Sequence, residues 1–176
     1  MTAGSPLTAR TSAYHPWTTY IAAREEARRR GDRKVGTEHL LLALLAEPDL
    51  SGVLDVTIEE ARAALDALDL QAFAAIGLDA RLDLPPLPST PLAELPRKPT
   101  FRAVLKGRLP MTPTAKKALE ASAKGTRRGR AQPGPRYVAK NVLAALLELE
   151  RPDPAAELLA GLGVEPAAIR ERLARV

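Results

Sequence analysis

Hydrophobic residues recur along this chain with the period of amphipathic helices, and the alternating pattern of strands is absent. Between residues 77 and 110, six prolines interrupt the helical pattern and favour extended backbone. We therefore expect an all-α fold with a proline-rich linker that carries a short helix near 102–106. The predicted helices span residues 16–30, 37–46, 57–75, 112–124, 139–150, 154–160 and 165–175.

The stretch VGTEHLLLALLAE, residues 35–47, combines three polar residues with a nearly unbroken leucine run. These leucines are apolar on every side of a helix, which predicts a central helix packed on all faces. We expect Thr37 to cap its N-terminus and Glu38 to lie in the first turn, where the helix dipole favours negative charge. The polar start is predicted to face outwards, with His39 hydrogen-bonded at the edge of the core.

Two parts of the chain resemble each other at fixed separations. The first matches are 103 residues apart and the later ones 108, which predicts a duplicated helical unit whose copies pack on one another. We expect the first copy to be shortened after Leu45 by most of a helix. The predicted organisation is a tail at 1–13, a first repeat at 14–76, a linker at 77–110 and a second repeat at 111–176. The matched residues are Val35, Leu40, Leu44 and Glu47 with Val138, Leu143, Leu147 and Glu150, then Leu54, Val56, Arg62 and Leu65 with Leu162, Val164, Arg170 and Leu173.

The stretch PMTPTAKKALE, residues 110–120, predicts a second well-defined helix start. Thr112 can cap this helix, and Pro113 suits the first helical position because its missing N–H costs nothing there. Met111 either folds back onto the first turn or stands partly exposed as an adaptable apolar contact. Lys116 and Glu120 are one turn apart on the exposed side and can pair weakly.

Charge is unevenly distributed along the chain. The net charge is +5, yet residues 97–140 hold 13 basic side chains and one acidic side chain. This asymmetry indicates an acidic partner, a nucleic acid, or packing of one half's surface against the other.

Motifs for catalysis are missing from the sequence. It has no cysteine, no GxxxxGK[ST] phosphate loop, no GxSxG elbow and no HExxH pair. We predict no catalytic residue, no cofactor and no metal. The longest apolar run, Leu40–Ala46, is far shorter than the roughly 20 residues that span a bilayer. The first dozen residues lack a secretory pattern, so we expect a cytoplasmic protein without a membrane partner.

The stretch AREEARRRGDRKVGTEHLLLALL, residues 23–45, resembles the signature of the Clp repeat, the duplicated helical module at the N-terminus of Clp-type AAA+ unfoldases. Residues 110–120 resemble the start of that family's second repeat, with Met111 in place of a phenylalanine. The resemblance implies a pseudo-twofold bundle of two repeats, each of about four helices. The second repeat normally has its own G-T-E-H start, but Ala139, Lys140, Asn141 and Val142 stand there. Because the chain ends where the family's ATPase modules would begin, we expect a free-standing N-domain.

The resemblance implies a non-catalytic docking module for Clp unfoldase and protease components, adaptors or degradation substrates. A free-standing N-domain could deliver its cargo or sequester it as a decoy. Some family members recognise phosphorylated arginine, a role that would fall to Glu38 for the guanidinium and to Thr37 with the helix-start amides for the phosphate. Family members also bind peptides and cyclic-peptide natural products near the second repeat's start, which here is Met111, Lys116 and Glu120.

Two other functions compete with docking. One is a nucleic-acid-binding regulator that uses the basic segment 97–140, with Tyr137 available for stacking. We rank it second because no recognition-helix motif accompanies the basic loop. The other, ranked third, is an enzyme built on Glu38 and His39.

Overall fold

The computed structural model describes residues 16–77, 109–127 and 135–175, and within them the chain is all-helical. The predicted short helix near 102–106, the tail and most of the linker lie outside these residues, so the predicted domain boundaries stay predictions. No helix of the described part is long and apolar enough to cross a bilayer. The helices are α1 (Pro16–Arg30), α2 (Thr37–Leu45), α3 (Pro48–Leu54), α4 (Ile58–Ala75), α6 (Pro113–Arg127), α7 (Pro135–Leu146), α8 (Pro154–Gly161) and α9 (Pro166–Arg175).

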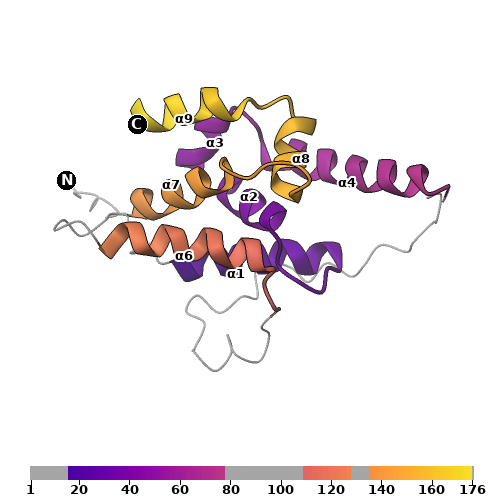
Figure 1. Cartoon of the computed structure of the whole chain (residues 1–176), viewed down its shortest axis with the longest axis horizontal. Coiled ribbons are helices and arrows are strands. Elements are labelled where there is room, and N and C mark those ends of the chain that lie inside the picture. The colour runs from indigo at the N-terminus through magenta and orange to yellow at the C-terminus, as the bar shows by residue number, and fades with distance from the viewer. Residues whose placement is uncertain (1–15, 78–108, 128–134, 176) are drawn as a thin grey trace, which may run out of the picture.

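The helices form two sets of four, α1–α4 and α6–α9, that pack into one body around α2 (Figure 1). Helix α2 packs against α1, α3, α4, α6, α7 and α8. Its leucines are 0–4% exposed, which confirms the predicted central helix. One aliphatic core contains buried side chains from both sets of helices, so the two repeats share it.

The predicted loss of a helix from the first repeat is wrong, because α3 follows α2 directly. Two residues separate α2 from α3, whereas seven separate α7 from α8. The shift from 103 to 108 therefore lies in the longer α7–α8 connection. Pro48 is at the first helical position of α3, where proline is favoured. The sequence carries no signal for this helix because its apolar residues do not follow a regular helical period.

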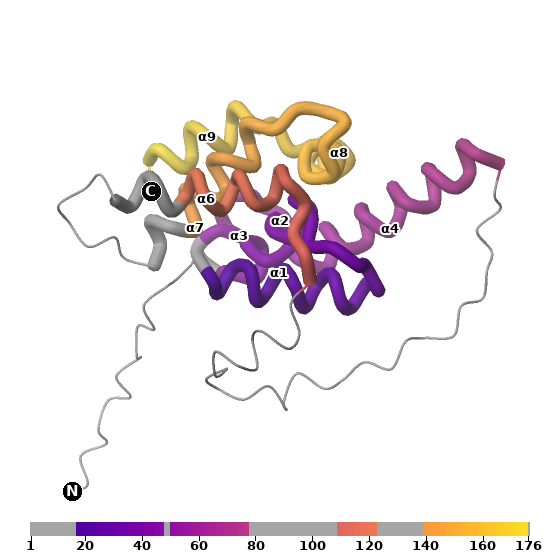
Figure 2. The backbone as a smooth tube through the Cα atoms, turned by 60° about the horizontal axis from the view of Figure 1, so that its bottom comes forward, coloured from indigo at the N-terminus to yellow at the C-terminus, as the bar shows by residue number. Residues whose placement is uncertain are grey.

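Helix α4 extends beyond the body (Figure 2), while its counterpart α9 is shorter. Thr57 caps α4 in a capping box with Glu60, so the predicted start is confirmed. The last two turns contact little, since every residue from 70 to 77 is exposed. Leu70, Phe73 and Ile76 account for most of the large exposed apolar side chains in the described part of the molecule.

Candidate binding site at the start of α2

The N-cap residue of α2 lies one position before the predicted cap, Thr37. The N-cap is Gly36, in extended backbone, and its N–H donates to His39 Nδ1 at 3.0 Å. Thr37 is the first helical residue, so its predicted capping role is wrong. His39, the third helical residue, thus reaches back to the backbone N–H of the N-cap Gly36 and satisfies one of the unpaired donors of the helix end.

Thr37 instead joins the two repeats. Its hydroxyl donates to Asp153 Oδ1 at 2.7 Å, and the same carboxylate oxygen accepts from Ala155 N–H at 3.0 Å and so caps α8. Thr37 and His39 are each 1% exposed, so the prediction that the whole polar start faces outwards is wrong for these two residues.

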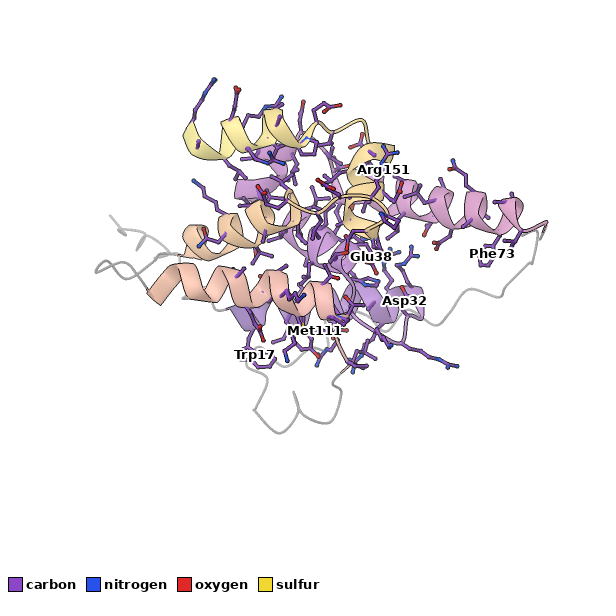
Figure 3. The ribbon with its side chains drawn as sticks, viewed as in Figure 1. Trp17, Asp32, Glu38, Phe73, Met111 and Arg151 are labelled. Carbon is purple, nitrogen blue, oxygen red and sulfur yellow. The ribbon has the colours of Figure 1, made fainter. Side chains whose placement is uncertain are left out.

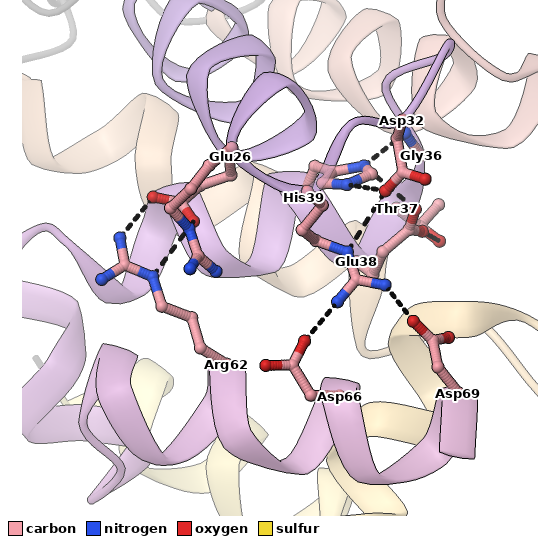
Figure 4. A network of polar contacts seen from close by, with 11 residues as sticks. Glu26, Asp32, Gly36, Thr37, Glu38, His39, Arg62, Asp66 and Asp69 are labelled. Atoms are coloured by element: carbon pink, nitrogen blue, oxygen red, sulfur yellow. Dashed lines mark hydrogen bonds and ion pairs between the residues drawn. The ribbon is translucent and has the colours of Figure 1, made fainter. Parts of the chain in front are cut away.

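His39 is a buried, hydrogen-bonded histidine at the core edge, as predicted. Its Nε2 lies 3.0 Å from Asp32 Oδ2, and its Nδ1 lies 3.0 Å from Glu38 Oε1 as well as from the Gly36 nitrogen (Figure 4). With 1% exposure the imidazole is poorly placed to exchange a proton with an external substrate, which argues against an enzyme built on Glu38 and His39.

Glu38 is the partly exposed member of this start, with 16% of its side chain accessible. Its carboxylate folds back over Gly36, so closely that a Cβ on Gly36 would lie 2.2 Å from Glu38 Oε1. A residue with a side chain at position 36 would therefore displace the carboxylate. Among Thr37, Glu38 and His39, Glu38 is the side chain that an external ligand can reach, and the Asp32 carboxylate on the other side of His39 is 42% exposed.

Arg30, the last residue of α1, makes ion pairs that fix the position of Asp32 beside His39. Arg30 donates to Asp32 at 3.2 Å, to Asp66 at 3.0 Å and to Asp69, and the last two acids lie on α4 (Figure 4). Burial lowers the pKa of Arg30, but the hydrogen bonds and charges of Asp69 and Asp32 outweigh it and raise the pKa above its usual value. The always-charged guanidinium thus fixes the carboxylate that orients His39.

The start of α6 lies beside the start of α2. Val35 N–H donates to Pro110 O at 2.8 Å and Thr112 N–H to Val35 O at 2.9 Å, an isolated parallel bridge that pairs Val35 with Met111. Thr112 caps α6, as predicted, by accepting from Ala115 N–H at 3.3 Å. Met111 is partly buried against the core.

Lys116 and Glu120 lie further along the exposed face of α6. Their charged groups are 3.8 Å apart, which confirms the predicted pair. Both side chains are more than half exposed, so the pair contributes little to stability. The structure thus brings Met111 close to the α2 start, whereas Lys116 and Glu120 belong to a neighbouring surface.

Sequence reasoning missed Gly36, Asp32 and Asp153. Asp153 had a detectable signal, because an aspartate directly before Pro154 is typical of an N-cap followed by proline at the first helical position. Asp32 had none, since its contact with His39 depends on the turn between α1 and α2.

The matching stretch of the second repeat makes no helix start. Helix α7 begins at Pro135, four residues before the predicted start, so Ala139, Lys140, Asn141 and Val142 lie inside it. Asn141 occupies the position of Glu38, and its buried Nδ2 has no hydrogen-bond partner. The first repeat alone has the acidic start.

Two parts of the basic segment proposed for nucleic acid, residues 97–108 and 128–134, lie outside the described residues. Lys116 and Lys117 are exposed on α6, and nothing is described for the side chain of Tyr137. In the described part of the chain, no group of three or more His, Asp or Glu side chains could hold a metal ion.

The fold is thus an all-helical bundle of two repeats, with the partly exposed Glu38 at the start of its central helix. The sequence profile of the Clp repeat (R) N-terminal domain family matches residues 17–148, and the chain belongs to this family. The family's domain is a non-catalytic protein-interaction module of Clp chaperones.

Solved structures confirm the fold. One similar structure is the N-terminal domain of the caseinolytic protease associated chaperone ClpD from Arabidopsis thaliana, with a TM-score of 0.57 and 18% identity, over 93% of this chain and 96% of that chain. At this identity the similarity shows the fold alone. A comparison with curated protein sequences found no match.

Proposed function

We propose that this domain docks degradation substrates or adaptors for a Clp unfoldase by binding an arginine side chain at Glu38. The observation that carries the proposal is the position of the Glu38 carboxylate, which is partly exposed at a helix start with Asp32 and Asp153 close by. A carboxylate can take a guanidinium in a bidentate, charge-assisted contact, and neighbouring acids favour a cation over an anion.

Phosphorylated arginine is the finer form of this ligand, and it needs a partner for the phosphate. The Thr37 hydroxyl already donates to Asp153, so we assign the phosphate to Arg151 and to the helix-start amides instead. Arg151 lies two residues before Asp153, in the connection that the Thr37–Asp153 bond anchors beside α2 (Figure 3). Its side chain is 65% exposed and lies 3.9 Å from Glu157, a loose pairing that a phosphate could replace.

Binding of fluorescently labelled peptides tests both statements. We compare peptides that carry one arginine, one phosphoarginine or one lysine, using the full chain, Glu38→Gln, Arg151→Gln and the control Glu171→Gln. Glu171 is an exposed acid on α9 that pairs weakly with Arg175. We expect Glu38→Gln to weaken both arginine peptides by about tenfold or more, the loss expected when one charged partner of a charge-assisted contact is removed. Arg151→Gln should weaken the phosphoarginine peptide only.

Equal binding by wild type and Glu38→Gln would contradict the docking role of Glu38. A lysine peptide that binds as tightly as the arginine peptide would show a general charge effect, since lysine cannot make the bidentate contact. Loss of binding in Glu171→Gln would have the same meaning.

We propose the start of α6 as a second peptide contact, made by Met111, Lys116 and Glu120. A flexible methionine and an exposed pair of opposite charges suit a variable peptide, and cyclic-peptide natural products are the small ligands of this kind. Glu120→Gln and Met111→Ala in the same binding assay should weaken a cyclic peptide while leaving the arginine peptide unchanged.

Docking and sequestration differ in their effect on degradation. In a reconstituted Clp degradation reaction, a docking module should raise the rate at which an arginine-bearing substrate is degraded. A decoy should lower that rate in proportion to its concentration. Glu38→Gln should remove either effect.

A further inference from the structure

The imidazole nitrogen His39 Nδ1 has two neighbours that require opposite protonation states. The Gly36 N–H donates to it at 3.0 Å and needs its lone pair. Glu38 Oε1 also lies 3.0 Å from it and needs an N–H. A neutral Nδ1 satisfies Gly36 and repels the carboxylate, whereas a protonated Nδ1 binds the carboxylate and repels the Gly36 amide.

The other ring nitrogen does not share this conflict. Nε2 lies 3.0 Å from Asp32 Oδ2, a carboxylate that Arg30 holds at 3.2 Å, so Nε2 carries a proton in both states. The proton that comes and goes is therefore the one on Nδ1.

The charged groups around the imidazole come from several elements. Asp32 and Arg30 face it from the end of α1 and the turn that follows, and Glu38 from α2. From α4, Asp66 and Asp69 reach Arg30, and from the α7–α8 connection Asp153 binds Thr37 beside it. The carboxylates attract a protonated imidazole and the Arg30 guanidinium repels it.

We propose that His39 acts as a proton-controlled latch on Glu38. With Nδ1 neutral, the Glu38 carboxylate is free to turn outwards and take a cationic ligand. With Nδ1 protonated, the imidazolium holds the carboxylate against Gly36, where the missing Cβ leaves room for it. His39 is thus a positioning residue that makes ligand binding sensitive to acid, an inference that rests on the proposed role of Glu38.

The test uses an arginine peptide, because its guanidinium does not titrate, across a range from about pH 8 to about pH 5.5 where histidines change charge. In wild type we expect the affinity to fall about fivefold or more, which corresponds to about 1 kcal/mol. His39→Gln is the matched variant, since glutamine at this third helical position can still accept from the N-cap amide but cannot titrate. Its affinity should match wild type at the upper pH and stay nearly constant.

The outcomes separate the two proposals. Absence of peptide binding at pH 8 in wild type would overturn the role of Glu38 itself. Binding that is present but equal at both pH values, or that falls equally in His39→Gln, would overturn the latch alone. If His39→Gln fails to fold, the Gly36 amide resonance of wild type decides: we expect it to shift with the imidazole titration, and a constant shift would overturn the latch.

Discussion

The start of α2 and the matching stretch of the second repeat have buried leucines at the same positions but different polar residues. Leu40 and Leu44 of α2, and Leu143 and Leu147 at the same spacing, are all 0–2% exposed. Yet α2 starts with a glycine cap and a cluster of acids, whereas the matching residues of α7 lie within a helix that began earlier. The shared core tolerates either beginning, so the polar cluster at the α2 cap can be lost without losing the fold.

The difference extends to single positions. The Glu38 carboxylate contacts Thr37 and His39, whereas the buried Nδ2 of Asn141 has no hydrogen-bond partner. A buried donor with no acceptor costs free energy. The second repeat therefore retains, at the position of Glu38, a polar side chain with one buried and unsatisfied donor.

Leucine truncation in both repeats gives the largest expected effect. Leu40→Ala and Leu143→Ala should each lower the free energy of unfolding by about 2–5 kcal/mol, because both side chains are fully buried in one core. Urea denaturation followed by circular dichroism measures this, with Leu70→Ala on the exposed part of α4 as the control. The control should cost about 0.5 kcal/mol or less.

Unequal losses would revise the comparison. A loss several times larger for Leu40→Ala than for Leu143→Ala would mean that the repeats do not contribute equally to the shared core. Two separate unfolding transitions would mean that the halves fold independently.

Sequence reasoning succeeded where a local pattern decides the structure. Period and capping signals located α1, the leucine helix, the start of α4 and the Thr112 cap, since these depend on residues a few positions apart. It failed at α3, which has a proline at its start and no regular apolar period. It identified Glu38 and His39 as neighbours but gave Thr37 the wrong role, because the Thr37 hydroxyl bonds a residue 116 positions away. Contacts that tertiary packing creates leave no local signal.

Removal of the bond between the repeats gives an intermediate effect. Asp153→Ala should lower the free energy of unfolding by about 1–2 kcal/mol, because it removes the cap of α8 and leaves the buried Thr37 hydroxyl without its acceptor. Glu47→Ala is the matched control, since Glu47 is the N-cap of α3 but makes no side-chain cap bond. Equal losses in the two variants would show that the Thr37–Asp153 bond contributes nothing to stability.

The matched arginines of α4 and α9 make different contacts. Arg62 donates to both carboxylate oxygens of Glu26 on α1, whereas Arg170 donates to the Leu147 carbonyl at 2.8 Å and lies 3.5 Å from the exposed Glu148. Burial raises the pKa of Glu26, but Arg62 and then Arg29 outweigh burial and hold that pKa below its usual value. The Leu147 carbonyl that accepts from Arg170, by contrast, does not take up a proton as the pH falls.

The smallest expected effect is a difference in acid sensitivity. Because the folded-state pKa of Glu26 is lowered, its ion pair stabilises the fold fully above the ordinary glutamate value of about 4.3 and is lost as the pH falls through the folded-state pKa. Arg62→Met should therefore cost about 1 kcal/mol at neutral pH and progressively less below about pH 4.5, as measured by thermal unfolding across pH. Arg170→Met should cost a similar amount or less and change less with pH, because its hydrogen bond goes to a carbonyl and its ion pair with the exposed Glu148 contributes little. Parallel pH profiles for the two variants would show that the repeats do not differ in this contact.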